Sequence, residues 1–310
     1  MKLVITVPAW NEEATLPATL AELPRSVEGF DEVETLVVDD GSTDRTRDVA
    51  RDAGAAVIRL PLHRGLAAAF TAGLAAAVDR HADVVVNTDA DGQYDPGAIP
   101  SLVAPIVRGE AEFVLGDRGV ATLGHFTPTK RALQRLGSAV VRFLSGVPVF
   151  DATTGFRAFS RAAASRLVCF TSFTYTLETL IQAGHAGLAV TSVPVATRPP
   201  SRPSRLFRSN TRYVTVSLLT LARLVFLYRP LRLLVGLGAL FLATAAALFI
   251  RFAYFYVTGL SPAGHVQSLI AAAVLAFAGL QLAVLGVLAD LTAVNRRLLS
   301  ELRARLLERI

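Results

Sequence analysis

Short apolar runs rich in β-branched residues alternate with alanine-rich stretches of helical period over roughly the first 118 residues. This alternation is typical of βα units around a mainly parallel sheet, and it predicts an α/β fold. We expect strands at residues 3–8, 34–39, 56–60, 84–88 and 113–116, and helices that begin near Glu12, Asp44, Gly65 and Asp95. Ligands bind beyond the carboxyl ends of strands in open α/β sheets, so the polar residues that follow these runs are the first candidates for function.

The pattern changes to long apolar stretches in the last third of the chain. Residues 231–257 and 266–289 are almost continuously apolar, and each is long enough to cross a hydrocarbon core of about 30 Å as a helix. The link between them has turn residues and no Lys or Arg, whereas arginines lie on both outer flanks. The positive-inside rule therefore predicts a two-helix transmembrane hairpin with both chain ends in the cytoplasm.

Basic and apolar residues also segregate at helical spacing in three other segments, residues 128–144, 206–228 and 291–310. The first segment could lie on a membrane surface, and Pro230 ends the second. We therefore expect a cytoplasmic domain at residues 1–197 and a juxtamembrane interface helix at 198–230. Two transmembrane helices at 231–289 and a cytoplasmic amphipathic tail helix at 290–310 would follow.

The charge balance supports this division. The chain has a net charge of +6, but residues 1–197 hold 17 Lys and Arg against 22 Asp and Glu, whereas residues 198–310 hold 14 against 3. A basic and apolar half suits an anionic membrane surface better than nucleic acid, so we expect no nucleic-acid partner. Cys169 is the single cysteine, which excludes an intrachain disulfide and a cysteine metal cluster. The apolar run at the N-terminus is too short for a secretory signal, which also favours a cytoplasmic first domain.

Asp89 and Asp91 follow the apolar run at residues 84–88 with one residue between them. Where a strand ends and turns, two such carboxylates can reach one hard cation, whose remaining positions are typically filled by water and phosphate oxygens. A diphosphate would complete that shell. The alternative is that both residues only cap the following turn and helix.

Two earlier strand ends carry similar polar clusters. Asp39 follows the second apolar run, where a carboxylate can accept a base N–H or hold ribose hydroxyls. Ser42 or Asp44 can cap the next helix, which explains part of that cluster without a ligand. Trp10, the only tryptophan, follows the first run and could stack on a base or belong to the core. The five histidines are scattered without ligand spacing, and we expect each to be structural or at the surface.

Residues 8–12, 38–44 and 89–93 together resemble the nucleotide and metal motifs of family 2 glycosyltransferases. Residues 151–157, Asp-Ala-Thr-Thr-Gly-Phe-Arg, are similar to the Asp-x-x-Ser-Gly-Tyr/Phe-Arg signature of the dolichol-phosphate mannose synthase and polyprenyl-phosphate glycosyltransferase group. The resemblance implies a Rossmann-like GT-A domain that binds a nucleotide-sugar with Mg²⁺ or Mn²⁺. The metal would be held by Asp89, Asp91 and Gln93. The implied donor contacts are Pro8, Trp10, Glu12, Asp39, Asp89, Ala90, Asp91 and Gln93.

This chain departs from the family pattern in two places. Trp10 stands where tyrosine is common, and the loop at residues 199–206 only loosely resembles the basic loop of the group. The first departure bears on base preference, and the second on the phosphate-contacting role of Arg202.

The acceptor implied by the resemblance is a polyprenyl phosphate, whose phosphate needs cations at the membrane interface. The candidate contacts are Arg118, Lys130, Arg131, Ser138 and Arg202. The alternative is that these side chains only touch solvent or lipid headgroups. The resemblance also allows self-association through the transmembrane helices.

The nucleophile suggests a mechanism. A lipid monophosphate has a second pKa near 6, so at neutral pH its oxygen is mostly anionic and could attack the sugar C1 with inversion and without a strong base. The implied catalytic residues are Asp91, Arg118 and Asp151. Asp151 matches the catalytic acid candidate of the group, but orientation of the sugar or acceptor is an equally good physical role. Glu178 is either an acidic residue near the acceptor or part of the core.

Two other functions compete with this interpretation. A polysaccharide synthase of the same fold is disfavoured because two spanning helices are too few to line a polymer channel and a Gln-x-x-Arg-Trp motif is absent. A membrane scaffold that keeps a nucleotide-binding fold without catalysis is the other. The residues do not distinguish UDP-sugars from GDP-sugars.

Overall fold

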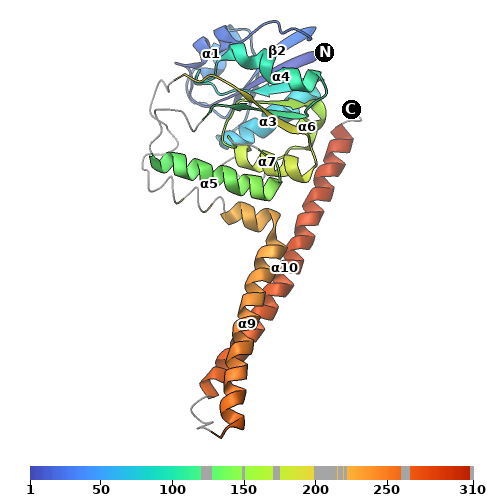
Figure 1. Ribbon diagram of the computed structural model, residues 1–310. Coiled ribbons are helices and arrows are strands. Elements are labelled where there is room, and N and C mark those ends of the chain that lie inside the picture. Colours follow the sequence, from blue (N-terminus) through green and yellow to red (C-terminus); the bar gives the residue numbers. More distant parts are fainter. Residues whose placement is uncertain are drawn as a thin grey trace. The chain divides into compact units, whose positions relative to one another are not determined.

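The computed structural model describes residues 1–119, 128–148, 151–169, 175–198, 215, 219, 222–259 and 266–307. The chain divides into two compact units, one formed by Met1–Thr220 with Ser300–Ile310 and the other by Leu221–Leu299. The first unit is built on a β-sheet, and the second is a pair of long helices (Figure 1).

A seven-stranded sheet organises the first unit, in the order β3-β2-β1-β4-β6-β5-β7. Its strands are β1 (Lys2–Ala9), β2 (Glu32–Asp39), β3 (Ala56–Arg59), β4 (Val84–Asn87), β5 (Phe113–Asp117), β6 (Arg157–Ser160) and β7 (Val190–Pro194). All pairs are parallel except those of β6, which runs antiparallel to β4 and β5. The five strands expected from the apolar runs are confirmed to within two residues at each end. The α/β fold class is therefore confirmed, and β6 and β7 extend the expected sheet.

Helices cover both faces of the sheet (Figure 1). They are α1 (Leu16–Glu22), α2 (Thr46–Asp52), α3 (Leu66–Asp79), the 3₁₀ turn η1 (Pro96–Ala98), α4 (Ile99–Val107), α5 (Pro128–Ser145), α6 (Arg161–Arg166) and α7 (Tyr175–His185). Alternate residues of β1, among them Ile5, pack in one core with residues of α1 and α4. Gly73 of α3 lies against Thr6 on the opposite face. Because β1 is covered on both faces, it reads as the continuous apolar run that marks a central parallel strand.

Helix α1 begins four residues later than expected, at Leu16 rather than near Glu12. The delay has a cause in the loop before it, where Asn11 adopts a positive φ of 52°. The Asn11 N–H donates to the Ser42 hydroxyl at 3.0 Å, and the Glu12 N–H donates to the Thr46 hydroxyl at 2.8 Å. These bonds join the loop after β1 to the loop after β2 and keep its residues out of the helix.

Strand pairing brings the polar strand ends together. Ala9 at the end of β1 is opposite Asp39 of β2, and Thr6 is opposite Asn87 at the end of β4. The antiparallel strand β6 starts with Arg157 opposite the same Asn87. The turn that precedes β6 therefore arrives at the edge of the sheet where the parallel strands end.

The second unit contains α9 (Pro230–Val257) and the part of α10 (Val266–Leu307) that ends at Leu299. Both are long and apolar enough to cross a membrane. They approach closely at two glycines, since a Cβ on Gly238 would lie 2.7 Å from the carbonyl oxygen of Gly279. Helix α10 continues without a break from the expected span into the expected tail helix, which contains no Gly or Pro to interrupt it. Most of the link at residues 258–264 and most of the expected interface helix at 206–228 lie outside the described residues, although residues 222–228 are helical.

Candidate active site

The loop after β4 carries the paired carboxylates. Gln93 folds back on Asp91, with its backbone N–H 3.1 Å from Oδ1 and its side-chain Nε2 2.6 Å from Oδ2. Burial, and then the charge of Asp91, raises the pKa of Asp89 to about 7. Two acids that resist ionisation together form a place where a cation would be stabilised. With the amide oxygen of Gln93, they fit the oxygen ligand set that Mg²⁺ or Mn²⁺ requires.

These ligands would not enclose a cation without further oxygens. Among the described residues, no three His, Cys, Asp or Glu side chains are grouped so that they could hold a metal ion. A bound diphosphate would supply the missing oxygens, which is the arrangement expected of a nucleotide-sugar site.

Gly155 lies directly against Asp89. A Cβ at this position would stand 2.7 Å from Oδ2 of Asp89 and 2.9 Å from the hydroxyl of Tyr175, so the space admits only glycine. The Gly155 peptide is held from both sides, because its N–H donates to the Tyr94 hydroxyl at 2.8 Å and its carbonyl accepts from Nδ2 of Asn87 at 2.9 Å. Tyr94 and Asn87 were not among the expected site residues, and only their place near strand ends could have marked them.

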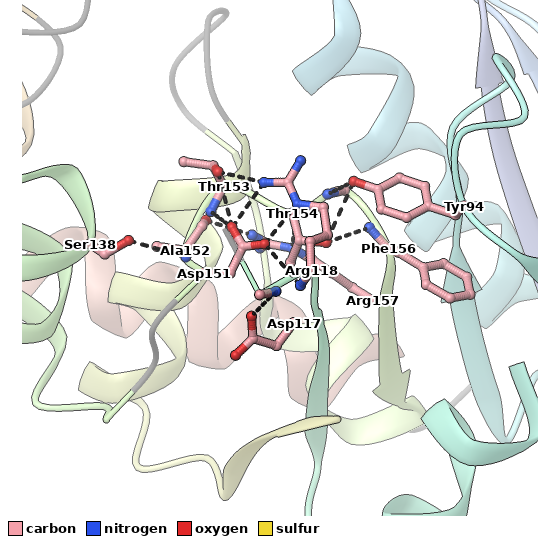
Figure 2. A network of polar contacts seen from close by, with 12 residues as sticks. Tyr94, Asp117, Arg118, Ser138, Asp151, Ala152, Thr153, Thr154, Phe156 and Arg157 are labelled. Atoms are coloured by element: carbon pink, nitrogen blue, oxygen red, sulfur yellow. Dashed lines mark hydrogen bonds and ion pairs between the residues drawn. The ribbon is translucent and has the colours of Figure 1, made fainter. Parts of the chain in front are cut away.

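Arg118 and Asp151 form a bidentate ion pair (Figure 2). Nε of Arg118 is 2.7 Å from Oδ2 of Asp151, and Nη2 is 2.9 Å from Oδ1. Nη2 also donates to the Thr153 hydroxyl at 2.8 Å. Burial acts to raise the pKa of Asp151, but the hydrogen bond and charge of Arg118 outweigh it, and the pKa is lowered. Asp151 is therefore a charged carboxylate at neutral pH, committed to holding Arg118.

The ion pair leaves one edge of the guanidinium available. Within the described part of the chain, Nη1 of Arg118 has no hydrogen-bond partner, and Figure 2 shows it pointing away from Asp151. Ser138 approaches from α5, where its buried hydroxyl accepts from the Ala152 N–H at 3.4 Å. Arg118, Asp151 and Ser138, expected from separate segments, therefore lie around one turn.

Arg157 lies beneath that turn with its side chain fully buried. Nε donates to the carbonyl of Thr154 at 2.7 Å, and Nη2 donates to the carbonyl of Ala152 at 2.9 Å. Nη1 donates to the carbonyl of Thr176 at 2.9 Å and to the hydroxyl of Thr179 at 2.7 Å. Burial lowers the pKa of Arg157 to about 10, which leaves it protonated at neutral pH.

Trp10 stands at the open edge of the sheet, 39% exposed, and stacks on His63 with ring centroids 4.0 Å apart. Nδ1 of His63 is 2.8 Å from Oδ2 of Asp40, whose carboxylate also accepts the N–H groups of Arg64 and Gly65. We expected His63 to be structural or at the surface, and that expectation did not include its stacking on Trp10, a candidate contact of the nucleotide-sugar. The Trp10 contact was not visible in the sequence because it depends on how the loop after β3 folds back.

Asp39 is buried, and both of its carboxylate oxygens have partners within the protein. Its Oδ1 accepts the Ser42 N–H at 2.8 Å, and its Oδ2 is 3.5 Å from Nε of Arg59. Glu12 accepts from the Thr15 hydroxyl at 2.7 Å, and its charge acts on Asp89, which places it near the paired acids. Pro8 and Ala90 are buried at the same edge.

The remaining candidates are more remote or lie outside the description. Lys130 and Arg131 belong to α5, which confirms the expected helix there, but their side chains are outside the described residues, as is all of Arg202. Glu178 is fully buried on α7. Burial, followed by the charge of Glu178, raises the pKa of Cys169 to about 12, so this acid lies near the thiol.

The mixed α/β sheet, with two acids at its carboxyl edge, has the fold of glycosyltransferases of the GT-A type. Residues 4–168 match the model of the family described as Glycosyl transferase family 2. The match covers more than half of the chain, which therefore belongs to glycosyl transferase family 2. The family resemblance seen in the motifs is confirmed.

The chain is similar to several named glycosyltransferases and to one solved structure. An undecaprenyl-phosphate mannosyltransferase of Micrococcus luteus is 28% identical over 207 residues, which are 63% of this chain and 83% of that protein. Glycosyltransferase AglJ of Haloferax volcanii is 30% identical over 93% of this chain and 92% of its own length. The crystal structure of glucosyl-3-phosphoglycerate synthase from Mycobacterium tuberculosis with Mn²⁺, UDP and glucosyl-3-phosphoglycerate has a TM-score of 0.56 at 27% identity. The matched region covers 71% of this chain and 79% of the synthase chain.

Proposed function

We propose that this protein transfers a sugar from a UDP- or GDP-linked donor to a polyprenyl phosphate at the cytoplasmic face of a membrane, with inversion at the sugar C1. The observation that carries the proposal is the turn at residues 151–155. Its Gly155 end abuts Asp89 of the paired acids, and its Asp151 end holds Arg118. One turn thus joins a site for a metal-bound diphosphate to a cation suited to a second phosphate.

The donor would bind at the Asp89 side of the turn. Asp89, Asp91 and Gln93 would hold Mg²⁺ or Mn²⁺, which when bound neutralises charge on the departing nucleoside diphosphate. Trp10, exposed at the same edge, offers a ring face for the base. The sheet-edge position agrees with the general placement of ligands at the carboxyl ends of strands.

The acceptor phosphate would bind at Arg118 through the guanidinium edge that carries Nη1. Its anionic oxygen attacks C1, the bond from C1 to the donor diphosphate breaks, and the diphosphate leaves with the electron pair. A phosphate monoester needs no strong base because it is already mostly ionised at neutral pH. We assign Asp151 the role of orienting Arg118, since its carboxylate is charged and bound to that guanidinium on two oxygens.

The membrane supplies the acceptor. Helices α9 and α10 are able to cross a bilayer, and arginines flank the pair on both outer sides. The positive-inside rule then places the α/β unit and both termini in the cytoplasm, where nucleotide-sugars would reach the site. Cysteine mapping of the link at residues 258–264 from outside intact cells tests this orientation.

The reaction is tested by giving the purified full chain Mn²⁺, labelled UDP- and GDP-sugars, and polyprenyl phosphate in bilayers. A single glycolipid whose anomeric configuration is opposite to that of the donor is expected. A polymer would instead support a polysaccharide synthase, and no product with any donor would support a scaffold.

The metal assignment is tested by Asp91→Asn. This variant should lose about a thousandfold in transfer rate, a loss in the range seen when one electrostatic catalytic group is removed. Asp79→Asn, an exposed acid at the end of α3, is the matched control and should transfer sugar at the normal rate. Full activity of Asp91→Asn would refute the assignment.

A further inference from the structure

Arg157 is a buried cation that the transfer mechanism does not use directly. Among the described residues, no carboxylate lies within ion-pair distance of its guanidinium, and its hydrogen bonds go to three backbone carbonyls and one hydroxyl. The rings of Phe113 and Tyr175 lie 5.5 and 5.7 Å from its central carbon. An apolar side chain would fill such a position at lower desolvation cost, so the arrangement of its donors needs an explanation.

The donors of Arg157 act on the inner side of one turn. The accepting carbonyls of Ala152 and Thr154 flank Thr153, so two of the three nitrogens fix the backbone on either side of the tip of the turn. The third nitrogen binds Thr176 and Thr179 in the first turns of α7. The turn is thereby fastened to a helix that is distant in sequence.

The outer side of the same turn makes the contacts of the active site. Asp151 and Thr153 bind Arg118 (Figure 2). Gly155 abuts Asp89. A shift of the turn would change both contacts at once, because Gly155 packs so closely on Asp89 that a Cβ added there would stand 2.7 Å from its Oδ2.

We infer that Arg157 is a positioning residue for sugar transfer, which sets the donor and acceptor sides of the site together by fixing the turn at residues 151–155. The inference rests on the proposed function. Lysine cannot replace arginine here, because one ammonium cannot reach carbonyls that are spread around a planar guanidinium. A misplacement of about 1 Å at a reacting centre can cost on the order of a hundredfold in rate.

The test compares Arg157→Lys, Thr179→Val and the control Ser165→Ala. Thr179→Val removes one acceptor of Arg157 and leaves its charge in place. Ser165→Ala removes a buried hydroxyl that donates to the carbonyl of Ala162 at 2.9 Å, within α6. Each variant is measured for unfolding temperature, for Mn²⁺-dependent binding of the nucleoside diphosphate that the wild type prefers, and for kcat and KM toward polyprenyl phosphate.

Arg157→Lys should lower kcat/KM for the lipid about a hundredfold and weaken nucleotide binding severalfold, and Thr179→Val should show about a tenfold loss in kcat/KM. Ser165→Ala should change neither constant, even where its unfolding temperature falls as much as that of Thr179→Val. Wild-type constants in folded Arg157→Lys, or equal kinetics in Thr179→Val and Ser165→Ala, would overturn the inference.

Two further outcomes are possible, and each has a defined interpretation. If Arg157→Lys does not fold, the comparison of Thr179→Val with Ser165→Ala decides. If the wild type transfers no sugar to any polyprenyl phosphate, the proposed function fails. Mn²⁺-dependent nucleotide binding is then the measurement that tests the role of Arg157, and normal binding in folded Arg157→Lys would refute it.

Discussion

The two sides of the site, which we propose bind the donor and the acceptor, are built in different ways. On the donor side, Trp10, Asp39 and Asp89 follow three parallel strands, so the register of the sheet alone brings them to one edge. On the acceptor side, Arg118 follows β5 and Asp151 belongs to a turn before an antiparallel strand. That turn is bound by Arg157 from below and by Ser138 of α5.

This difference indicates where each side is vulnerable. The donor side depends on strand pairing and individual side chains, so local substitutions there should affect nucleotide binding alone. The acceptor side depends on one turn with several long-range partners, so a substitution in that turn should affect more than one contact of the site. Gly155 is the point where the two sides touch, and substitution there should affect both.

Among the substitutions that test this contrast between the two sides, Gly155→Ala should have the largest effect. The new methyl group would stand 2.7 Å from one oxygen of Asp89 and 2.9 Å from the other, so either the acid or the turn must move. We expect transfer to fall more than a hundredfold, with weaker Mn²⁺-dependent nucleotide binding and a raised KM for lipid phosphate. Gly236→Ala, where a Cβ meets nothing within 4 Å, is the control. Normal nucleotide binding in Gly155→Ala would show that the two sides are independent.

Arg118→Lys should affect the acceptor side alone. Lysine loses the fork that binds Asp151 and offers a point charge in place of a planar donor set. We expect kcat/KM for polyprenyl phosphate to fall about thirtyfold, with Mn²⁺-dependent nucleotide binding unchanged within twofold.

Arg108→Lys is a matched control for this change. Arg108 binds Glu110 through the same two nitrogens, at 2.8 Å each, but on an exposed surface. Such a pair contributes little, so its loss should leave both constants at wild-type values. A drop in nucleotide binding by Arg118→Lys would contradict the separation of the two sides.

The same contrast explains what could be predicted from the sequence. The five strands that lead to the donor edge were predictable because buried parallel strands are apolar runs with polar ends. Strand β6 was not, because its four residues begin with Arg157 and show no apolar alternation. Its place in the sheet is decided by pairing with β4 and β5, far away in the chain.

Contacts between distant segments were hidden for the same reason. The Asp151 motif could be recognised by resemblance, but its partner Arg118 and its clamp by Arg157 depend on tertiary packing. Tyr94, which holds the Gly155 N–H, looks like an ordinary aromatic residue in the sequence. The late start of α1 likewise follows from hydrogen bonds between two loops, which no local propensity reveals.

His63→Ala should have a smaller effect, confined to the donor side. The His63 ring supports Trp10 by stacking at 4.0 Å, and a stacked aromatic pair contributes about 0.5–1.5 kcal/mol beyond its buried area. We expect the KM for the nucleotide-sugar to rise about threefold to tenfold, and the KM for lipid phosphate to stay constant. His185→Ala, which removes a ring bound to the carbonyl of Ile181 on α7, is the control. An effect on the lipid KM in His63→Ala would show that the loops at this edge reach the acceptor.

The last prediction concerns thiol reactivity rather than sugar transfer, which it leaves unchanged, and tests the packing around Cys169. Burial, and then the charge of Glu178, raises the pKa of Cys169 to about 12, compared with about 8.5 for a free thiol. Because only the thiolate reacts, alkylation of the native protein at pH 8 should be on the order of a thousandfold slower than that of free cysteine. The rate should rise about tenfold per pH unit up to pH 10, since the thiolate fraction grows in that proportion below the pKa. Mass spectrometry of iodoacetamide-treated protein measures this, with denatured protein as the control for full reactivity. A native rate near that of free cysteine would mean that burial and the charge of Glu178 do not hold the Cys169 thiol in its protonated form.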